Sequence, residues 1–187
     1  MRRLKPLVIS LLCLLCACEE DPQYSNTYCN FLFQAFLFPS SALTKAVSSD
    51  GGDFCIVKAT GTSPVHLKCT PNQGSYNQAD LDLPMTTAIG NERLNYNAMG
   101  HKRGLVIGRT YEGVLCAYDL QCPNCDFNYE LVWGDKPHLL KCNKCQRVYN
   151  IYSSISYVES GPEGRPLEQY RRVNYDRNQG ILQVRNP

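Results

Sequence analysis

Cys122-Pro-Asn-Cys125, followed after sixteen residues by Cys142-Asn-Lys-Cys145, is the pattern around which this chain is organised. A Cys-x-x-Cys turn points both thiols to one side, and two such turns supply the four ligands of a tetrahedral metal site. Two disulfides, or four unrelated thiols, are the alternatives, but doubled x-x spacing is poorly suited to joining distant segments. We therefore predict that Cys122, Cys125, Cys142 and Cys145 bind one metal centre.

The residues between the two cysteine motifs predict a hairpin that carries one motif at each base. Its apolar runs, 129–133 and 138–140, flank the turn-prone stretch 134–137. A second predicted hairpin, formed by 104–108 and 113–118, leads the chain to the first motif.

Short apolar segments recur along the rest of the chain, and no convincing amphipathic helix of ordinary length appears outside the first residues. The run 31–38 is continuous, which predicts a buried strand or another packed first element. Residues 71–100 are rich in Asn, Gly and Pro and predict an irregular connection. The remaining predicted strands are 54–59, 66–70, 147–152, 170–175 and 181–184. The sequence thus predicts an all-β fold, an antiparallel sandwich or barrel with both cysteine motifs at one tip.

Residues 1–17 predict a signal peptide, because a basic start precedes an apolar core shorter than the about 20 residues of a spanning helix. The ending Leu15-Cys-Ala-Cys18 resembles a bacterial lipobox, in which Cys18 becomes the acylated first residue. A plain secretory peptide cut near the same place is the alternative. Residues 18–28 then form a lipidated tether, and 29–187 form a single domain.

Glu19-Glu-Asp21 resembles the acidic export signal of Bacteroidetes surface lipoproteins, although three acids also suit a solvated tether. We expect a bacterial cell-envelope protein anchored by lipid to the outer membrane, either periplasmic or surface-exposed. Removal of 1–17 takes away Arg2, Arg3 and Lys5, which leaves 16 of the 19 basic side chains against 17 acidic ones. This balance gives no case for nucleic acid or anionic lipid headgroups as partners.

Eleven cysteines fall to eight if Cys13 and Cys16 leave with the signal peptide and Cys18 is lipidated. Besides the two motifs, the remaining thiols are Cys29, Cys55, Cys69 and Cys116. An exported compartment permits two disulfides among them, but the sequence does not give their connectivity. Cys116 lies in an apolar run, where a buried free thiol is at least as good an interpretation as a bridge.

The second half of the chain, from about Gly104 to Val184, resembles the Rieske-type iron–sulfur domain and its Bacteroidetes lipoprotein relatives. The resemblance rests on the order of the 104–118 hairpin, the two cysteine motifs and the tail that begins at Ser160-Gly-Pro162. In that family each of two loops supplies one cysteine and one histidine to a two-iron two-sulfur cluster. Here Asn124 and Cys145 occupy the two positions at which the family has histidine.

Loss of both imidazoles changes the chemistry that the resemblance implies. Four thiolates suit zinc or a single rubredoxin-like iron, and a two-iron two-sulfur cluster at low potential is a further alternative. Zinc leads, because it needs no assembly machinery and tolerates an oxidising compartment. A four-sulfur zinc site has no open coordination position and hence offers no Lewis-acid catalysis. His66, His101 and His138 are interpreted as surface residues and not as ligands.

These observations favour a non-catalytic, membrane-anchored binding or structural module whose metal locks two tip loops. An electron carrier with iron in the same site and an oxidoreductase partner in the envelope is the alternative. Thiol–disulfide exchange is a weaker third hypothesis, because such catalysts usually place the reactive cysteine pair at the start of a helix, and no helix is predicted here. No Ser-His-Asp set, carboxylate pair or phosphate-binding loop supports hydrolysis or group transfer.

Overall fold

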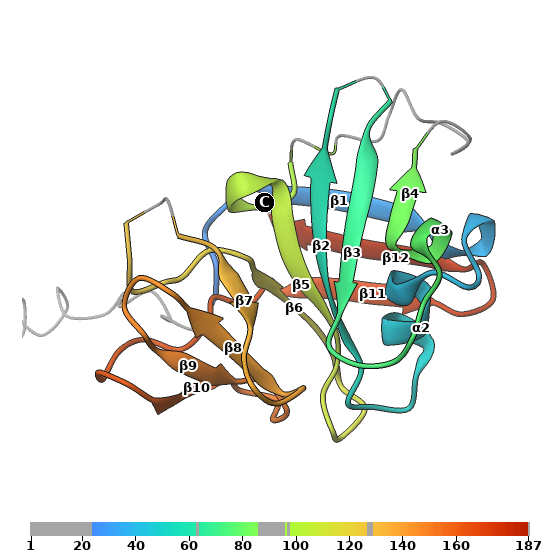
Figure 1. Cartoon of the computed structure of the whole chain (residues 1–187). Helices are drawn as coiled ribbons and strands as arrows, with labels where there is room; N and C mark the ends of the chain where they lie inside the picture. The colour runs from blue at the N-terminus through green and yellow to red at the C-terminus, as the bar shows by residue number, and fades with distance from the viewer. Residues whose placement is uncertain (1–23, 63, 86–95, 97, 127–128, 187) are drawn as a thin grey trace, which may run out of the picture.

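The computed structural model contains three antiparallel sheets and a few short helices (Figure 1). It describes residues 24–62, 64–85, 96, 98–126 and 129–186. The predicted signal peptide and Cys18 lie outside these residues. Within them, no helix is both long and apolar enough to cross a membrane. The all-β class predicted from the sequence is confirmed.

A five-stranded sheet in the order β4-β3-β2-β5-β6 forms the centre of the molecule. Its strands are β2 (Phe54–Thr60), β3 (His66–Pro71), β4 (Asp82–Pro84), β5 (Gly104–Arg109) and β6 (Leu115–Asp119). Strand β5 is buried on both faces, because Leu105 and Ile107 belong to one core cluster and Val106 to another. Alternate side chains of a strand point to opposite faces, so this apolar run fits the middle layer.

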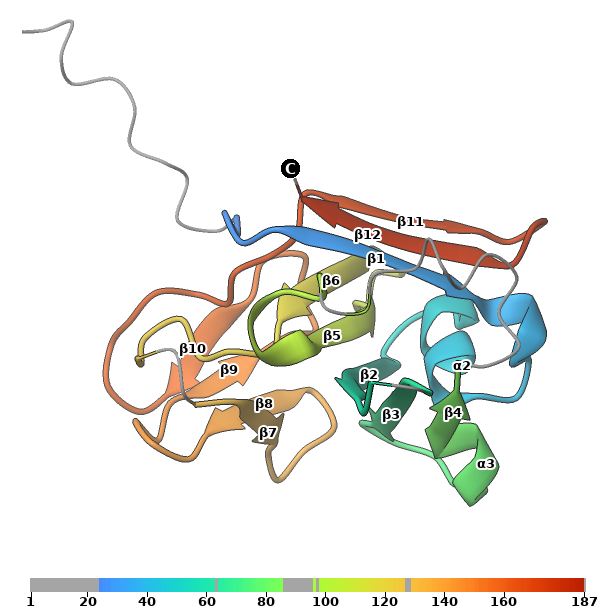
Figure 2. The same ribbon diagram turned by 90° about the horizontal axis from the view of Figure 1, so that it is seen from above.

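One face of the central sheet packs against a three-stranded sheet in the order β1-β12-β11 (Figure 2). Its strands are β1 (Cys29–Gln34), β11 (Arg172–Asp176) and β12 (Ile181–Asn186). The predicted apolar run 31–38 begins in β1, where Phe31 and Phe33 are buried and Leu32 is half-buried. It continues in the 3-10 helix η1 (Ala35–Leu37).

The other face of the central sheet packs against a four-stranded sheet in the order β10-β9-β8-β7. Its strands are β7 (Leu131–Trp133), β8 (Leu139–Cys142), β9 (Val148–Asn150) and β10 (Tyr157–Ser160). Leu131 pairs with Cys142 across the β7–β8 hairpin, so the predicted hairpin between the two cysteine motifs is confirmed. The sheet brings the two motifs to one end of the molecule.

The short elements were harder to anticipate from the sequence. Helix α2 (Ala42–Ser48) has only seven residues, but its apolar side is buried and the Ser41 hydroxyl accepts a hydrogen bond from the Thr44 N–H at 3.2 Å. Helix α3 (Gln78–Leu81) and η3 (His101–Arg103) are shorter still. A helix of this length gains too little from its own hydrogen bonds, so packing and capping decide where it forms.

The four cysteines outside the motifs, Cys29, Cys55, Cys69 and Cys116, are buried free thiols. Cys116 thus has the environment predicted for a buried thiol. Burial raises the pKa of both the Cys29 and the Cys116 thiols to about 12, which makes them poor nucleophiles.

Gly108 allows β5 and β2 to approach closely. A Cβ added there would lie 2.2 Å from the Asp53 carbonyl oxygen and 2.6 Å from the Phe54 Cα. Because backbone atoms cannot move aside without disturbing the ladder, we expect Gly108→Ala to cost about 1–3 kcal/mol of unfolding free energy. Urea denaturation measures the change. Gly134→Ala, whose nearest contact is 3.0 Å to the Leu139 Cβ, is the control and should cost less; equal midpoints for both variants would contradict this account.

Candidate metal centre

Two backbone turns present the four cysteines. In the first turn the Cys125 N–H donates to the Cys122 carbonyl at 3.3 Å, while the Cys122 N–H donates to the Tyr129 carbonyl at 3.0 Å. In the second turn the Gln146 N–H donates to the Cys142 carbonyl at 2.9 Å. Gln146 has a positive φ of 59°, so the chain reverses sharply after Cys145. Each turn therefore directs two thiols to the same side.

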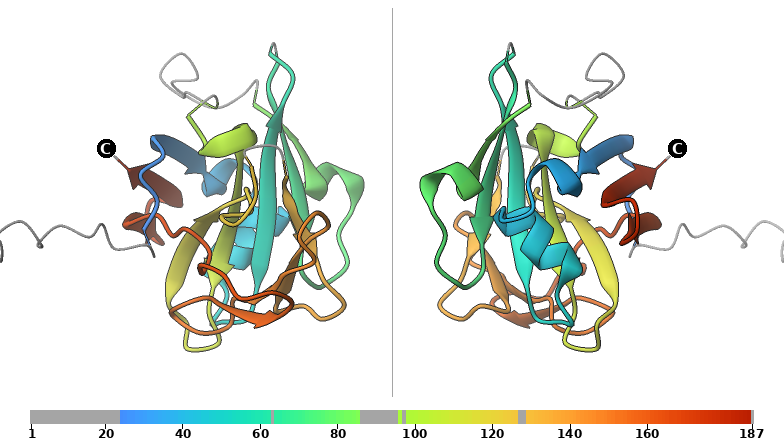
Figure 3. Two further views of the ribbon diagram at one scale, coloured as in Figure 1. Left: turned by 90° about the vertical axis from the view of Figure 1, so that its left-hand side faces the viewer. Right: turned by 90° about the vertical axis from the view of Figure 1, so that its right-hand side faces the viewer.

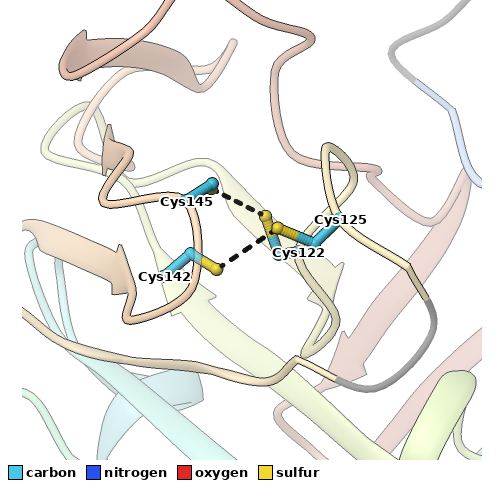
Figure 4. Close-up of side chains that lie close together, drawn as sticks. All are labelled: Cys122, Cys125, Cys142 and Cys145. Carbon is cyan, nitrogen blue, oxygen red and sulfur yellow. Dashed lines mark hydrogen bonds between the residues drawn. The ribbon is translucent and has the colours of Figure 1, made fainter.

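The four sulfur atoms converge on one point (Figure 4). All four Sγ atoms lie within 4.8 Å of one another. Cys122 is 3.7 Å from Cys145, and Cys125 is 3.8 Å from Cys142, measured between Sγ atoms. A tetrahedral ion with bonds of about 2.3 Å to sulfur requires sulfur–sulfur edges of about 3.8 Å. The structure thus brings together the four predicted ligands at the spacing that one metal ion requires.

The site has a buried side and a more accessible side. Cys122 and Cys142 are completely buried, whereas Cys125 and Cys145 are partly exposed. Cys122 and Cys142 belong to the core cluster that also contains Tyr149 and Leu140. An ion bound here would lie against the hydrophobic core on one side and near solvent on the other.

Tyr149 supports the buried ligand. Its side chain is fully buried, and its hydroxyl oxygen lies 3.2 Å from the Cys122 Sγ. The Asn124 side-chain amide donates to the same hydroxyl at 3.0 Å, which leaves the hydroxyl proton free to point at the sulfur. A donor held in this way favours the thiolate form of Cys122. Tyr149 was not singled out from the sequence, where it appeared only as part of a strand.

The loop 160–166 makes contacts with both cysteine turns. Asn124 and Arg165 exchange hydrogen bonds, with the side-chain amide donating to the Arg165 carbonyl at 2.8 Å and accepting from its N–H at 2.9 Å. Arg147 donates to the Glu163 carbonyl at 2.8 Å. Gly164 lies so close that an added Cβ would be 2.6 Å from both the Asn124 Oδ1 and the Arg147 Nε. The loop therefore packs against residues of both cysteine turns.

The surroundings give the thiols very different acidities in the absence of metal. Burial raises the pKa of Cys122 to about 11, although the Tyr149 and Asn124 hydrogen bonds oppose the rise. Burial also raises the pKa of Cys145, but hydrogen bonds from the main chain and guanidinium of Arg147, together with those from the Cys125 and Cys142 thiols, outweigh it and lower the pKa to about 6. Cys145 is thus the first of the two to become a thiolate, and its negative charge lies next to Arg147.

The histidines take no part in this group of ligands, which in the described residues consists of cysteines alone. His138 is half-buried against the Tyr152 ring, with centroids 4.7 Å apart, and is less exposed than the sequence suggested. His66 accompanies Lys68 in contact with Asp82, at 2.7 Å from the carboxylate. Like His138, His66 and His101 are half-buried, so all three are less exposed than the sequence suggested.

A polar pocket of ≈ 230 Å³ adjoins Cys125 and is lined in part by His101, Asp119 and Gln121. Asp119 is 2 % exposed and accepts from the Tyr170 hydroxyl at 2.6 Å and from the His101 N–H at 3.0 Å. Burial raises the pKa of this carboxyl. Since its hydrogen bonds are to neighbouring segments, Asp119 fixes the end of β6 just before the first cysteine turn.

Comparison with protein-family models, with curated proteins and with solved structures gives no match for this chain.

Replacing Tyr149 with Phe removes the hydroxyl donor while keeping the ring in the core. We expect metal affinity to fall by about 10- to 100-fold, as is typical for partners that support metal ligands. Competition with a chromophoric chelator measures this change. Tyr129→Phe is the control, because in the described structure that hydroxyl makes no hydrogen bond to the sulfurs. Equal affinities for the two variants would show that the Tyr149 hydroxyl does not support Cys122.

Proposed function

We propose that this chain is a metal-binding module in which Cys122, Cys125, Cys142 and Cys145 hold one zinc ion in a structural, non-catalytic role. The supporting observation is the convergence of four sulfur atoms within 4.8 Å, with two contacts of 3.7 and 3.8 Å. Four thiolates around zinc leave no open position for a substrate, so the ion acts by holding the fold together. Any binding function of the module would then belong to the protein surfaces that the metal stabilises.

The size of the cluster favours a mononuclear ion over a two-iron two-sulfur cluster. A binuclear cluster places two irons and two sulfides between the thiolate pairs, and therefore holds ligands of different irons further apart than ligands of one ion. Four sulfurs that are all mutual neighbours leave room for a single ion. Zinc and a single iron both satisfy this condition, and the choice of zinc rests on its availability without assembly machinery.

Electron transfer through a single iron is the second candidate. Its support is the partial exposure of Cys125 and Cys145, which brings two ligands near the surface that a redox partner would meet. Hydrogen bonds to ligand sulfurs tune reduction potentials, and the Tyr149 hydroxyl is placed to make one. An oxidoreductase partner in the cell envelope belongs to this candidate.

We also propose kinship with Rieske-type domains and attachment to a bacterial envelope membrane through a lipid on Cys18. The kinship is supported by two cysteine turns presented at one end of an antiparallel β fold, with the loop 160–166 packed against both. The lipid anchor and the outer-membrane location are supported by the sequence of residues 1–21. Such a domain would present its metal site to partners near the membrane surface.

Cys142→Ser should abolish stoichiometric metal binding, because it removes one of four thiolates at the buried side of the site. Metal analysis of the purified protein gives the content, and colour with electron paramagnetic resonance separates zinc from iron. Cys116→Ala is the matched control, since Cys116 is equally buried but lies outside the cluster. Because metal must displace protons from the thiols, apparent affinity should also fall as pH falls. Full metal occupancy in Cys142→Ser would exclude the proposed ligand set.

Cys18→Ser should release the protein from membranes or block its processing, because the acyl chains can no longer be attached. Membrane fractionation and labelling with a radioactive fatty acid measure the two effects. Cys13→Ser, within the apolar stretch of the signal, is the control and should leave both unchanged. Persistent acyl labelling of Cys18→Ser would place the lipid elsewhere.

A further inference from the structure

Two arginines face each other directly at one end of the three-stranded sheet. Arg172 on β11 pairs in register with Arg185 on β12, and Arg185 pairs with Asn30 on β1. Residues directly opposite in a ladder share a face, so these three side chains form one row across the sheet. Both arginines are exposed, whereas the next residue of β12, Asn186, is buried. The row therefore lies on the outer face of the sheet.

Among the described residues, the arginine row has no ion-pair partner. In the part of the chain that the structure describes, neither Arg172 nor Arg185 has a carboxylate within ion-pair distance. Asp176 lies on the same face of β11, but four residues along a strand correspond to about 13 Å. Like charges directly opposite each other destabilise a sheet. An anion between the two guanidinium groups would remove that repulsion.

The row lines an open depression of ≈ 300 Å³ that also includes Tyr28. Tyr28 is 57 % exposed. A ring with a polar tip, placed beside cationic side chains, is the combination found where proteins meet the lipid–water interface.

The segment before β1 runs beside this depression, and hydrogen bonds to Ser25 and Thr27 hold it against the domain. The Ser25 N–H donates to the Gln169 carbonyl at 2.9 Å, and the buried Asn186 amide donates to the Thr27 carbonyl at 3.1 Å. A third arginine, Arg171, lies over the Tyr24 ring at 4.5 Å from its centroid. Figure 3 shows β1 beside β12 on this side of the molecule. Arg171 thus lies at the point of exit, and Arg172 and Arg185 line the depression beside it.

The sequence limits how far this point can lie from a lipid on Cys18. Cys18 precedes Tyr24 by six residues, which span at most about 21 Å when fully extended. If Cys18 is acylated, the three arginines are among the charges of the described domain that the chain itself holds near the bilayer. Basic side chains close to an anionic membrane bind it about fivefold more tightly per residue.

We propose that Arg171, Arg172 and Arg185 form a contact surface for the phosphate groups of anionic phospholipids, and that this contact orients the domain on its membrane. The proposal rests on the membrane attachment proposed above. It also revises the expectation, drawn from net charge alone, that anionic headgroups are not partners. Total charge is near balance, but the three cations are concentrated where the chain leaves the domain.

The test is arginine footprinting of the full-length protein, purified in detergent and reconstituted into vesicles. One set of vesicles contains phosphatidylglycerol and phosphatidylcholine in equal amounts, and the other contains phosphatidylcholine alone. Phenylglyoxal modifies accessible guanidinium groups, and mass spectrometry gives the rate at each site. We expect modification of Arg171, Arg172 and Arg185 to slow several-fold in the anionic vesicles only. Arg177, an exposed arginine in the turn after β11, is the internal control and should react equally in both.

Two results would overturn the proposal. Equal modification rates at these arginines in the two kinds of vesicle would mean that anionic headgroups do not contact them. Protection that is already complete in detergent would mean that a soluble anion or the acidic residues Glu19, Glu20 and Asp21 occupy the surface. Replacing those three acids by their amides, and adding inorganic phosphate, separates these two sources. Acyl labelling of Cys18 in the same preparation shows whether a failure lies in the anchor or in the contact surface.

A stability measurement distinguishes the contact surface from a structural role of the same side chain. In detergent without vesicles, Arg185→Gln should raise the thermal midpoint, because it removes the repulsion from Arg172. The same variant should lose about fivefold in affinity for anionic vesicles when binding is compared with Arg177→Gln. A lower midpoint for Arg185→Gln would show that the guanidinium already has a stabilising partner in the protein and would contradict the proposal.

Discussion

Four sulfur atoms held within 4.8 Å of one another are the constraint on which this end of the structure depends. As thiolates they repel one another, and as thiols they leave a cluster of weakly bonded groups at the edge of a core. A cation at their centre would resolve both problems, because it would favour the thiolates and join the two turns directly. Arg147 and the Tyr149 hydroxyl add positive charge and a donor at the periphery, where they oppose the same repulsion.

The four-cysteine cluster could be predicted from the sequence because its information is local. The spacing Cys-x-x-Cys fixes the geometry of each turn, and a hairpin of ordinary length brings the turns together. The strands of the central sheet were also recognisable, since β2, β5 and β6 consist of apolar runs between turn residues. In these parts of the chain local sequence preference and tertiary structure agree.

The remaining features depend on contacts between distant residues, which no local pattern reveals. Strand β4 has only three residues and pairs with the longer β3, and β10 and β9 pair although they have only four and three residues. Asn124 reaches across 41 residues to Arg165, and Tyr149 reaches back 27 residues to Cys122. The arginine row was hidden for the same reason, because Arg172 and Arg185 become neighbours only when β11 and β12 pair. Net charge, a sum over the whole chain, could not reveal it.

The pairing of β1 with β12 has a consequence for the order of folding. Cys29 lies opposite Asn186, so the first described strand finds its partner only after the strands of the other two sheets have been synthesised. Closing a loop of this length is slow compared with forming the β7–β8 hairpin, whose partners are separated by a short turn. The hairpin that joins the two cysteine turns can therefore form on a partly folded chain, before the outer sheet is complete.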